Sequence, residues 1–107
     1  MNLATEINGR LGYRTIALRN ENRISVEDLS EASGLTPSMI RKVERGNRNF
    51  RSHTLCQLAK TFKVDPDYFM IRDIYLAQAM RDPVFAAHMA EMARQYFERP
   101  GKENPAA

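Results

Sequence analysis

The stretch S-V-E-D-L-S-E-A-S-G-L-T-P-S-M-I-R-K-V-E-R, from Ser25 to Arg45, carries the start and stop signals of two short helices. Ser25 followed by Asp28 has the spacing of a capping box at the start of a helix. Gly34 predicts the end of that helix, because glycine adopts the left-handed conformation without steric cost. Thr36 can cap a second helix directly after the turn. The stretch therefore predicts two helices joined by a tight turn.

Apolar residues divide each of these two helices into an inner and an outer face. In the first helix, Val26, Leu29 and Ala32 fall on one side, and in the second Ile40 and Val43 do so. Pro37 suits the first turn of the second helix, where its missing N–H is no loss. The residues left to point outward from the second helix are polar or basic, namely Ser38, Arg41, Lys42 and Arg45.

The chemistry of the second helix is suited to DNA. A helix in the major groove needs short polar groups and long cations that reach base edges and phosphates. A single charged helix face would indicate only solvent exposure, but here it follows a capped helix and a glycine turn. From Thr36 to Arg51 there are five cations and one acid. The predicted DNA-binding residues are Thr36, Pro37, Ser38, Met39, Arg41, Lys42, Arg45, Asn47, Arg48 and Arg51.

The segment from Leu11 to Met70 resembles the XRE/Cro helix-turn-helix family of phage and bacterial transcriptional regulators. The matching segments are L-G-Y-R-T-I-A-L-R at 11–19, I-S-V-E-D-L-S-E-A-S-G-L-T at 24–36, I-R-K-V-E-R-G at 40–46 and L-C-Q-L-A-K-T-F-K-V-D at 55–65. The resemblance implies an all-α fold, with a five-helix repressor-like helix-turn-helix domain over residues 8–70 and one or two additional C-terminal helices. It also implies binding of double-stranded DNA.

The resemblance further implies an ion pair between Arg19 and Glu44 that ties the first helix to the recognition helix. Two positions depart from the family. Val26 stands where a glutamine often donates to a DNA phosphate, which is expected to weaken affinity more than sequence choice. Phe50 stands where proline is usual, and its side chain is expected in the core.

The other helices of the domain follow from helical spacing. The first is expected over about residues 10–20, with Leu11, Thr15 and Leu18 inward and Arg14 outward. An earlier start stays open, because Leu3 and Ile7 are four residues apart. The Thr15 hydroxyl can bond back to a helical carbonyl. Ser52 can cap the fourth helix, in which Cys56 reads as a small buried apolar residue rather than a redox thiol.

Residues 71–99 are expected to form a C-terminal helical extension, and residues 100–107 a disordered tail. Asp82 and Pro83 begin its long last helix, which carries a wide apolar face. The preferred interpretation is a homodimer interface. Two alternatives stay open, namely a helix that folds back on its own core and a docking helix for a regulatory partner protein. The predicted interface residues are Phe85, Met89, Met92, Ala93 and Tyr96.

Composition limits the remaining functions. With 107 residues and a net charge of +3, the chain is expected to hold one small domain and an appendage. The single cysteine cannot form an intramolecular disulfide. No apolar run approaches the ~18 residues that span a membrane, so a cytoplasmic protein without membrane contact is expected. Two isolated histidines and no phosphate loop, metal-ligand cluster or nucleophile–base pair argue against an enzyme, a metal site or a cofactor.

The function expected from these features is sequence-specific transcriptional regulation. We expect a repressor that binds a palindromic operator as a homodimer. The alternative is an antitoxin or adaptor-type protein-binding module whose C-terminal helices hold a partner protein.

Overall fold

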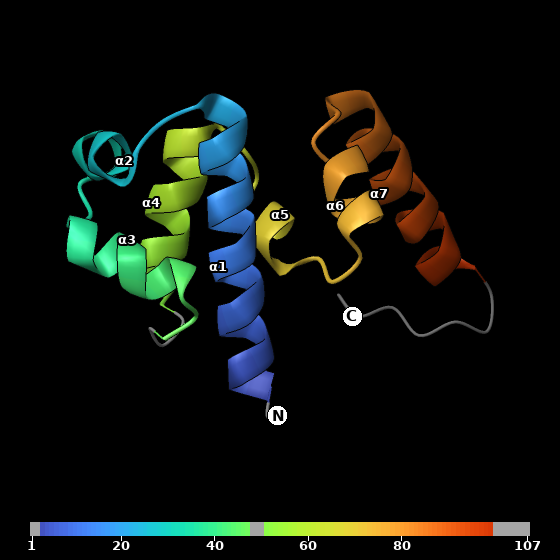
Figure 1. Ribbon diagram of the computed structural model, residues 1–107. Coiled ribbons are helices and arrows are strands. Elements are labelled where there is room, and N and C mark those ends of the chain that lie inside the picture. Colours follow the sequence, from blue (N-terminus) through green and yellow to red (C-terminus); the bar gives the residue numbers. More distant parts are fainter. Residues whose placement is uncertain (1–2, 48–50, 100–107) are drawn as a thin grey trace.

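The computed structural model describes residues 3–47 and 51–99, which contain helices and no strand. The expected all-α fold is therefore confirmed (Figure 1). The helices of the described part are α1 (Leu3–Asn22), α2 (Val26–Ser33), α3 (Pro37–Glu44), α4 (Ser52–Phe62), α5 (Asp67–Met70), α6 (Ile74–Ala79) and α7 (Pro83–Glu98).

The core lies between the first five helices. Helix α1 packs against α3, α4 and α5, and α2 packs against α3 and α4 (Figure 1). Leu18, Leu29, Ile40, Leu58 and Phe69 come from these five helices, and each is at least 99% buried. Full burial of such a side chain contributes about 1.5–3 kcal/mol of transfer free energy. The two short helices of the turn motif are thus held in place mainly by one shared apolar core.

The caps predicted around the turn are present. The Ser25 hydroxyl accepts from the Asp28 backbone N–H at 3.0 Å, and the Asp28 carboxylate accepts from the Ser25 N–H at 3.1 Å. Gly34 ends α2 with a φ of 77°. The Thr36 hydroxyl accepts from the Met39 N–H at 3.1 Å and begins α3. These local contacts fix both ends of the turn.

Helices α1 and α3 approach each other most closely at Gly12. A Cβ atom at this position would lie 2.3 Å from the backbone carbonyl oxygen of Val43 and 3.0 Å from that of Glu44. Both distances are too short for a side chain to be accommodated without movement of α3. Gly12 therefore sets how closely the last turn of α3 can lie against α1.

The first helix differs from its prediction in length and in one orientation. It begins at Leu3, before the expected start near residue 10. Arg14 was predicted outward, but it is 3% exposed. Its guanidinium donates to the backbone carbonyls of Tyr68 and Arg72, the latter at 3.3 Å. Burial lowers the pKa of Arg14, and these carbonyls stabilise the charge that burial penalises.

Three other local expectations are wrong. Ala32 is exposed, and the neighbouring Ser33 is buried in its place, because the buried face of α2 runs through Leu29 and Ser33, four residues apart. Cys56 is exposed on the outer side of α4. Ser52 is the first residue of α4 and not its cap.

The expectation for Thr15 is confirmed, because its hydroxyl donates to the Leu11 carbonyl at 2.7 Å. Phe50 and residues 100–107 lie outside the described residues.

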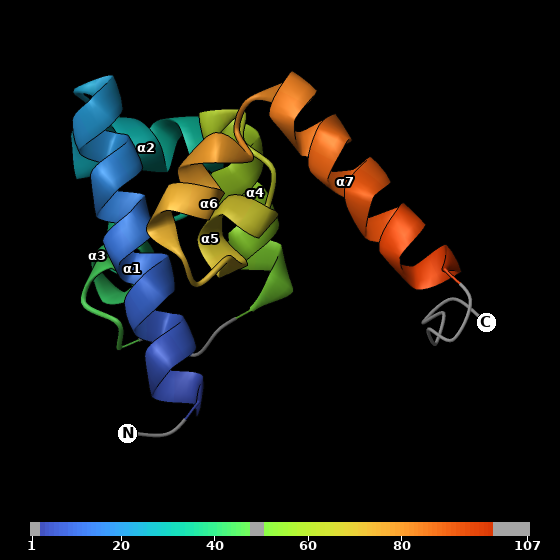
Figure 2. The ribbon, with the colours of Figure 1, turned by 90° about the vertical axis from the view of Figure 1, so that its right-hand side faces the viewer.

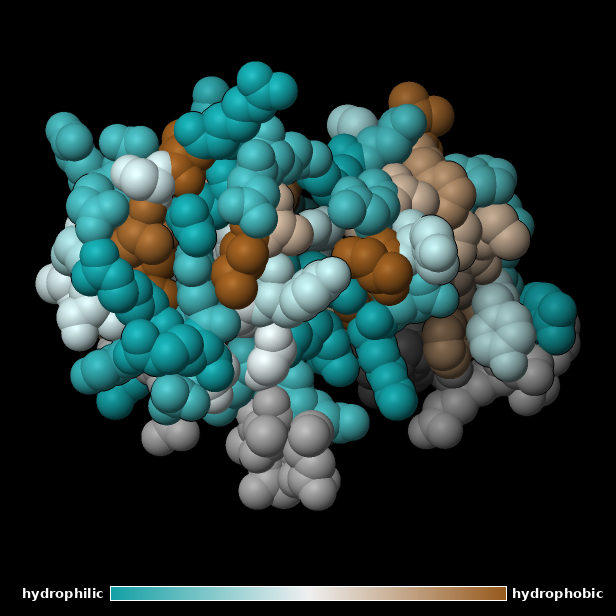
Figure 3. All heavy atoms as spheres, in the orientation of Figure 1, coloured by the Kyte–Doolittle hydropathy of each residue, from teal (hydrophilic) through white to brown (hydrophobic). Residues whose placement is uncertain are grey.

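The C-terminal extension leaves the domain at α5. Helix α6 packs on α5 through the fully buried Ala77. Helix α7 then projects away from the first five helices (Figure 2) and contains no buried residue. Apolar surface gathers over α6 and α7, whereas hydrophilic side chains dominate over α3 (Figure 3). The alternative in which α7 folds back to enlarge its own core is therefore not observed.

Candidate DNA-binding surface

Helix α3 presents a polar and basic face on an apolar base. Ile40 and Val43 are buried against the core, which fixes the rotation of the helix about its axis. The opposite face is exposed and carries Ser38, Arg41 and Lys42, with Thr36 exposed at the N-cap and Arg45 at the C-cap. The side chains predicted to point outward thus lie together on one surface.

Two of the predicted DNA-binding residues are less accessible than the others. Pro37 is half-buried in the first turn of α3. Met39 is also half-buried and packs against the core cluster. Either residue can offer an apolar edge to a thymine methyl group, but neither extends freely from the surface.

The exposed guanidinium of Arg41 is paired with a carboxylate on the neighbouring helix. An Nη atom of Arg41 lies 2.5 Å from the Glu27 carboxylate, and both side chains are about half-exposed or more. Glu27 lies in the first turn of α2, where a negative charge also complements the helix dipole. Sequence reasoning missed this pairing because the two residues lie on different helices, and only the crossing of α2 and α3 brings them together.

Arg19 and Glu44 join α1 to the end of α3. The guanidinium donates to both carboxylate oxygens, at 2.8 and 3.1 Å, and also to the Ile24 carbonyl at 3.2 Å. The two side chains are 20% and 11% exposed. The hydrogen bond to Glu44 is the largest cause of a raised pKa at Arg19. The pair therefore stays charged and holds the C-terminal end of α3 against α1.

The segment after α3 continues the polar surface. Gly46 has a φ of 71°, which turns the chain out of the helix. Asn47 is exposed, and its backbone N–H donates to the Lys42 carbonyl at 3.0 Å. Arg51 is exposed directly before α4. Arg48 lies outside the described residues.

The residues predicted for self-association lie on a separate part of the molecule. They all belong to α7, on the far side of α5 from α2 and α3 (Figure 1). Phe85 and Met89 are half-buried, while Met92, Ala93 and Tyr96 are exposed. The structure thus keeps the two predicted surfaces apart, so one can be occupied without blocking the other.

Among residues 3–47 and 51–99, no group of three or more His, Cys, Asp or Glu side chains is placed to hold a metal ion. Within the same residues, no helix is both long and apolar enough to cross a membrane.

Comparison with known proteins places the chain in a family. No curated protein matches it. A family model described as helix-turn-helix (HTH_3) matches residues 16–69, which extend from the middle of α1 to α5 and include the capped α2–α3 pair. This match covers half of the chain. It includes α3 and the polar segment after it, but not the C-terminal extension with α6 and α7. The chain belongs to this XRE-type helix-turn-helix family of DNA-binding transcription regulators.

Proposed function

We propose that the protein is a sequence-specific repressor that binds a palindromic operator as a homodimer. The observation that carries this proposal is the exposed face of α3, on which Ser38, Arg41, Lys42 and Arg45 stand above the buried Ile40 and Val43. Polar and cationic groups held rigidly on one helix face match the requirements of major-groove reading. The repressor assignment rests on the resemblance to phage and bacterial regulators.

The residues of this surface divide into two roles. Arg41 and Lys42 contact bases or the phosphates beside them, guanine being the usual base target of an arginine fork. Thr36, Ser38 and Met39 adjust recognition at neighbouring positions. The cations and amide after α3 contact phosphates, which position the protein without specifying sequence. The proposed phosphate ligands are Asn47, Arg48 and Arg51.

The partner surface of the dimer is α7 of a second copy. Three large apolar side chains of α7 are between 40% and 51% exposed, namely Met92, Tyr96 and Phe97. This is more exposed apolar surface than is usual for a helix that faces only water. Arg94 pairs with Glu91 and Glu98 of its own helix, so the positive charge of Arg94 is compensated within α7. Two-fold association would present two α3 helices to half-sites one turn apart, about 34–36 Å.

Selection of bound sequences from a random duplex pool, together with sedimentation of the purified protein, tests this function. An enriched inverted repeat and a dimeric protein are the expected results. A pool that never enriches, with a monomer that associates only when a second protein is added, would support the adaptor alternative instead.

A further inference from the structure

Arg81, in the turn between α6 and α7, reaches back to the end of α1. Its guanidinium donates to both carboxylate oxygens of Glu21, at 2.8 and 3.1 Å, and to the Gln78 side chain at 3.0 Å. The hydrogen bond to Arg81 is the main cause of a lowered pKa at Glu21. This two-point pair joins residues that lie 60 positions apart in the chain. The C-terminal extension is thereby connected to the first helix of the DNA-binding domain.

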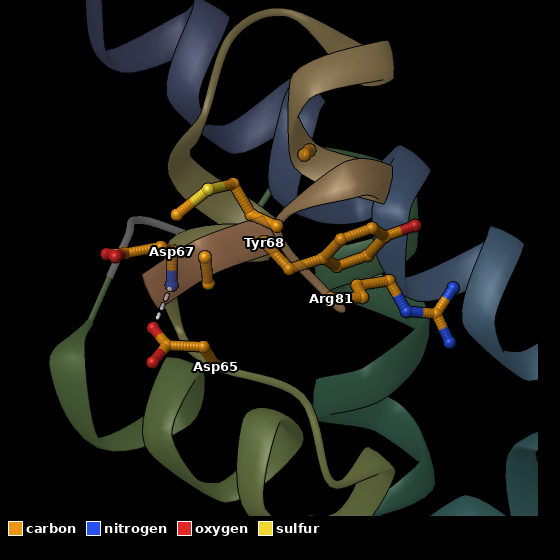
Figure 4. Close-up of a pocket in the computed structure, with 7 residues that line it drawn as sticks. Asp65, Asp67, Tyr68 and Arg81 are labelled. Carbon is orange, nitrogen blue, oxygen red and sulfur yellow. Dashed lines mark hydrogen bonds between the residues drawn. The ribbon is translucent and has the colours of Figure 1, made fainter. Parts of the chain in front are cut away.

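The same guanidinium packs on the aromatic ring of Tyr68. It lies 5.4 Å from the ring centroid, within the range of a cation–π contact. Tyr68 is 3% exposed and belongs to the core, and Arg14 lies 5.5 Å from the same ring. Figure 4 shows the Tyr68 ring alongside Arg81. Arg81 therefore contacts two elements of the domain, α1 through Glu21 and α5 through Tyr68.

Arg81 lies directly before the start of α7, so its contacts act at the point where α7 leaves the domain. The next residue, Asp82, caps α7 by accepting from the Val84 N–H at 2.8 Å. No residue of α7 is fully buried, and only Phe85, Ala86 and Met89 are half-buried, so the apolar contact of α7 is limited to the part of the helix nearest its start. A small cavity of about 60 Å³, lined by Tyr68, Ala77, Arg81 and Ala86 among others, lies where α7 begins (Figure 4). Apolar packing at the junction is thus incomplete, and the contacts of Arg81 with Glu21 and Tyr68 add to it.

We propose that Arg81 is a positioning residue that fixes the direction of α7 relative to α3, and so sets the separation of the two recognition helices. The second part of this statement rests on the proposed dimer. A rigid junction holds two α3 helices at one separation, whereas a loose junction accepts several separations and lowers the effective concentration at any one of them.

The first test measures the junction within one chain and needs no DNA. Cys56 is the chain's single cysteine and is exposed on α4, so it accepts a nitroxide label directly. A second label at Ala87→Cys, an exposed position on α7, completes the pair. Labelled chains are diluted with unlabelled protein, and pulsed electron spin resonance records the distance distribution. We expect a narrow distribution in the parent and a clearly broader one in Arg81→Gln.

Arg94→Gln is the matched control, because it removes an ion-paired arginine within α7 itself. Its distribution should remain narrow. The exchange Glu21→Arg with Arg81→Glu should restore a narrow distribution that Arg81→Glu alone broadens. Equal widths in the parent and Arg81→Gln would overturn the proposal. If Arg81→Gln loses its helical circular dichroism, Glu21→Gln takes its place, since it removes the ion pair and leaves Arg81 over the ring.

The second test uses DNA and separates this inference from the proposed function. Inverted repeats with spacers of different length are titrated with the parent and with Arg81→Gln. The parent should prefer one spacer by about tenfold over spacers two base pairs away, and the variant by less than about threefold, with single half-site affinity unchanged. A variant that keeps the full preference would overturn the proposal. A parent that binds no repeat would refute the dimeric regulator, while the spin-label widths would still decide the role of Arg81.

Discussion

The guanidinium of Arg41 on α3 is held by the carboxylate of Glu27 on α2, with 2.5 Å between the nitrogen and the oxygen. Arg41 is the residue that we propose to read a base. An exposed ion pair contributes only about 0–1 kcal/mol, so a base offering two acceptors can replace the carboxylate. In the free protein, Glu27 therefore orients Arg41 at the surface, and under the proposed function a base would have to displace this carboxylate.

Glu27→Gln should tighten binding to DNA of arbitrary sequence by up to about fivefold, because it frees Arg41 and removes a charge that repels phosphates. Titration of a random-sequence duplex at two salt concentrations measures this change. The control is Glu31→Gln, which removes an equal charge from an exposed position of the same helix. An identical gain in both variants would show that total charge, and not the pair with Arg41, is responsible.

Arg41→Ala should weaken binding to the selected operator by about 1–3 kcal/mol and relax the preference at one base position, since a base contact is lost. Arg51→Ala is the comparison, because Arg51 is exposed outside α3 and is proposed to bind phosphate. This second variant should weaken all sequences alike and reduce the salt dependence. Selection repeated with each variant distinguishes the two effects. An unchanged consensus for Arg41→Ala would reassign the reading residue.

The pair of Arg19 and Glu44 should contribute measurably to stability, because both partners are largely buried and doubly hydrogen-bonded. A double-mutant cycle with Arg19→Ala and Glu44→Ala, followed by urea unfolding, should give a coupling free energy of about 0.5–3 kcal/mol. Each single variant should also weaken operator binding, since α3 loses its support. Additive single effects would mean that the two side chains act independently.

Gly12→Ala should destabilise the fold by about 1–3 kcal/mol, because the added methyl group meets the Val43 carbonyl. Gly9→Ala in the same helix is the matched control, since a Cβ there meets nothing within 4 Å. That control should stabilise the protein by about 0.5–1 kcal/mol through helix propensity. Thermal unfolding of both variants checks whether stability falls in Gly12→Ala and rises in Gly9→Ala. A neutral Gly12→Ala would show that α3 can shift away from α1.

The capping box makes the stability of α2 dependent on pH. Hydrogen bonds from Ser25 lower the pKa of Asp28 below its ordinary value. The contribution of this carboxylate is present above the unfolded pKa of about 3.9 and is lost as pH falls through the lower folded pKa. The difference in Tm between the parent and Asp28→Ala should thus be largest near neutral pH and shrink in acid. A difference that grows in acid would contradict this assignment.

The parts of the fold that sequence predicted are those encoded by neighbouring residues. The capping box at Ser25, the left-handed turn at Gly34 and the cap at Thr36 each depend on atoms a few residues apart. The rotation of α3 followed from the spacing of Ile40 and Val43. Such signals act before any tertiary contact forms, and they were sufficient to define the helix-turn-helix and its outward face.

Other features could not be predicted from spacing alone. Arg14 occupies a position that reads as solvent-facing, and only the approach of α5 supplies the carbonyls that make its burial tolerable. Cys56 reads as apolar, but the face of α4 that carries it is left uncovered. In both residues the environment is decided by which element packs against the helix, and that choice involves residues far away in the chain.

The sequence by itself thus determined which segments become helices, where α2 and α3 begin, and which side chains α3 offers to a partner. Tertiary structure alone decided the pairing of Glu27 with Arg41, the close approach at Gly12, and the contact of Arg81 with Glu21 and Tyr68. The physical reason is one of range. Caps and helical faces arise from interactions within one or two turns, whereas these contacts exist only after separate helices have packed on a common core.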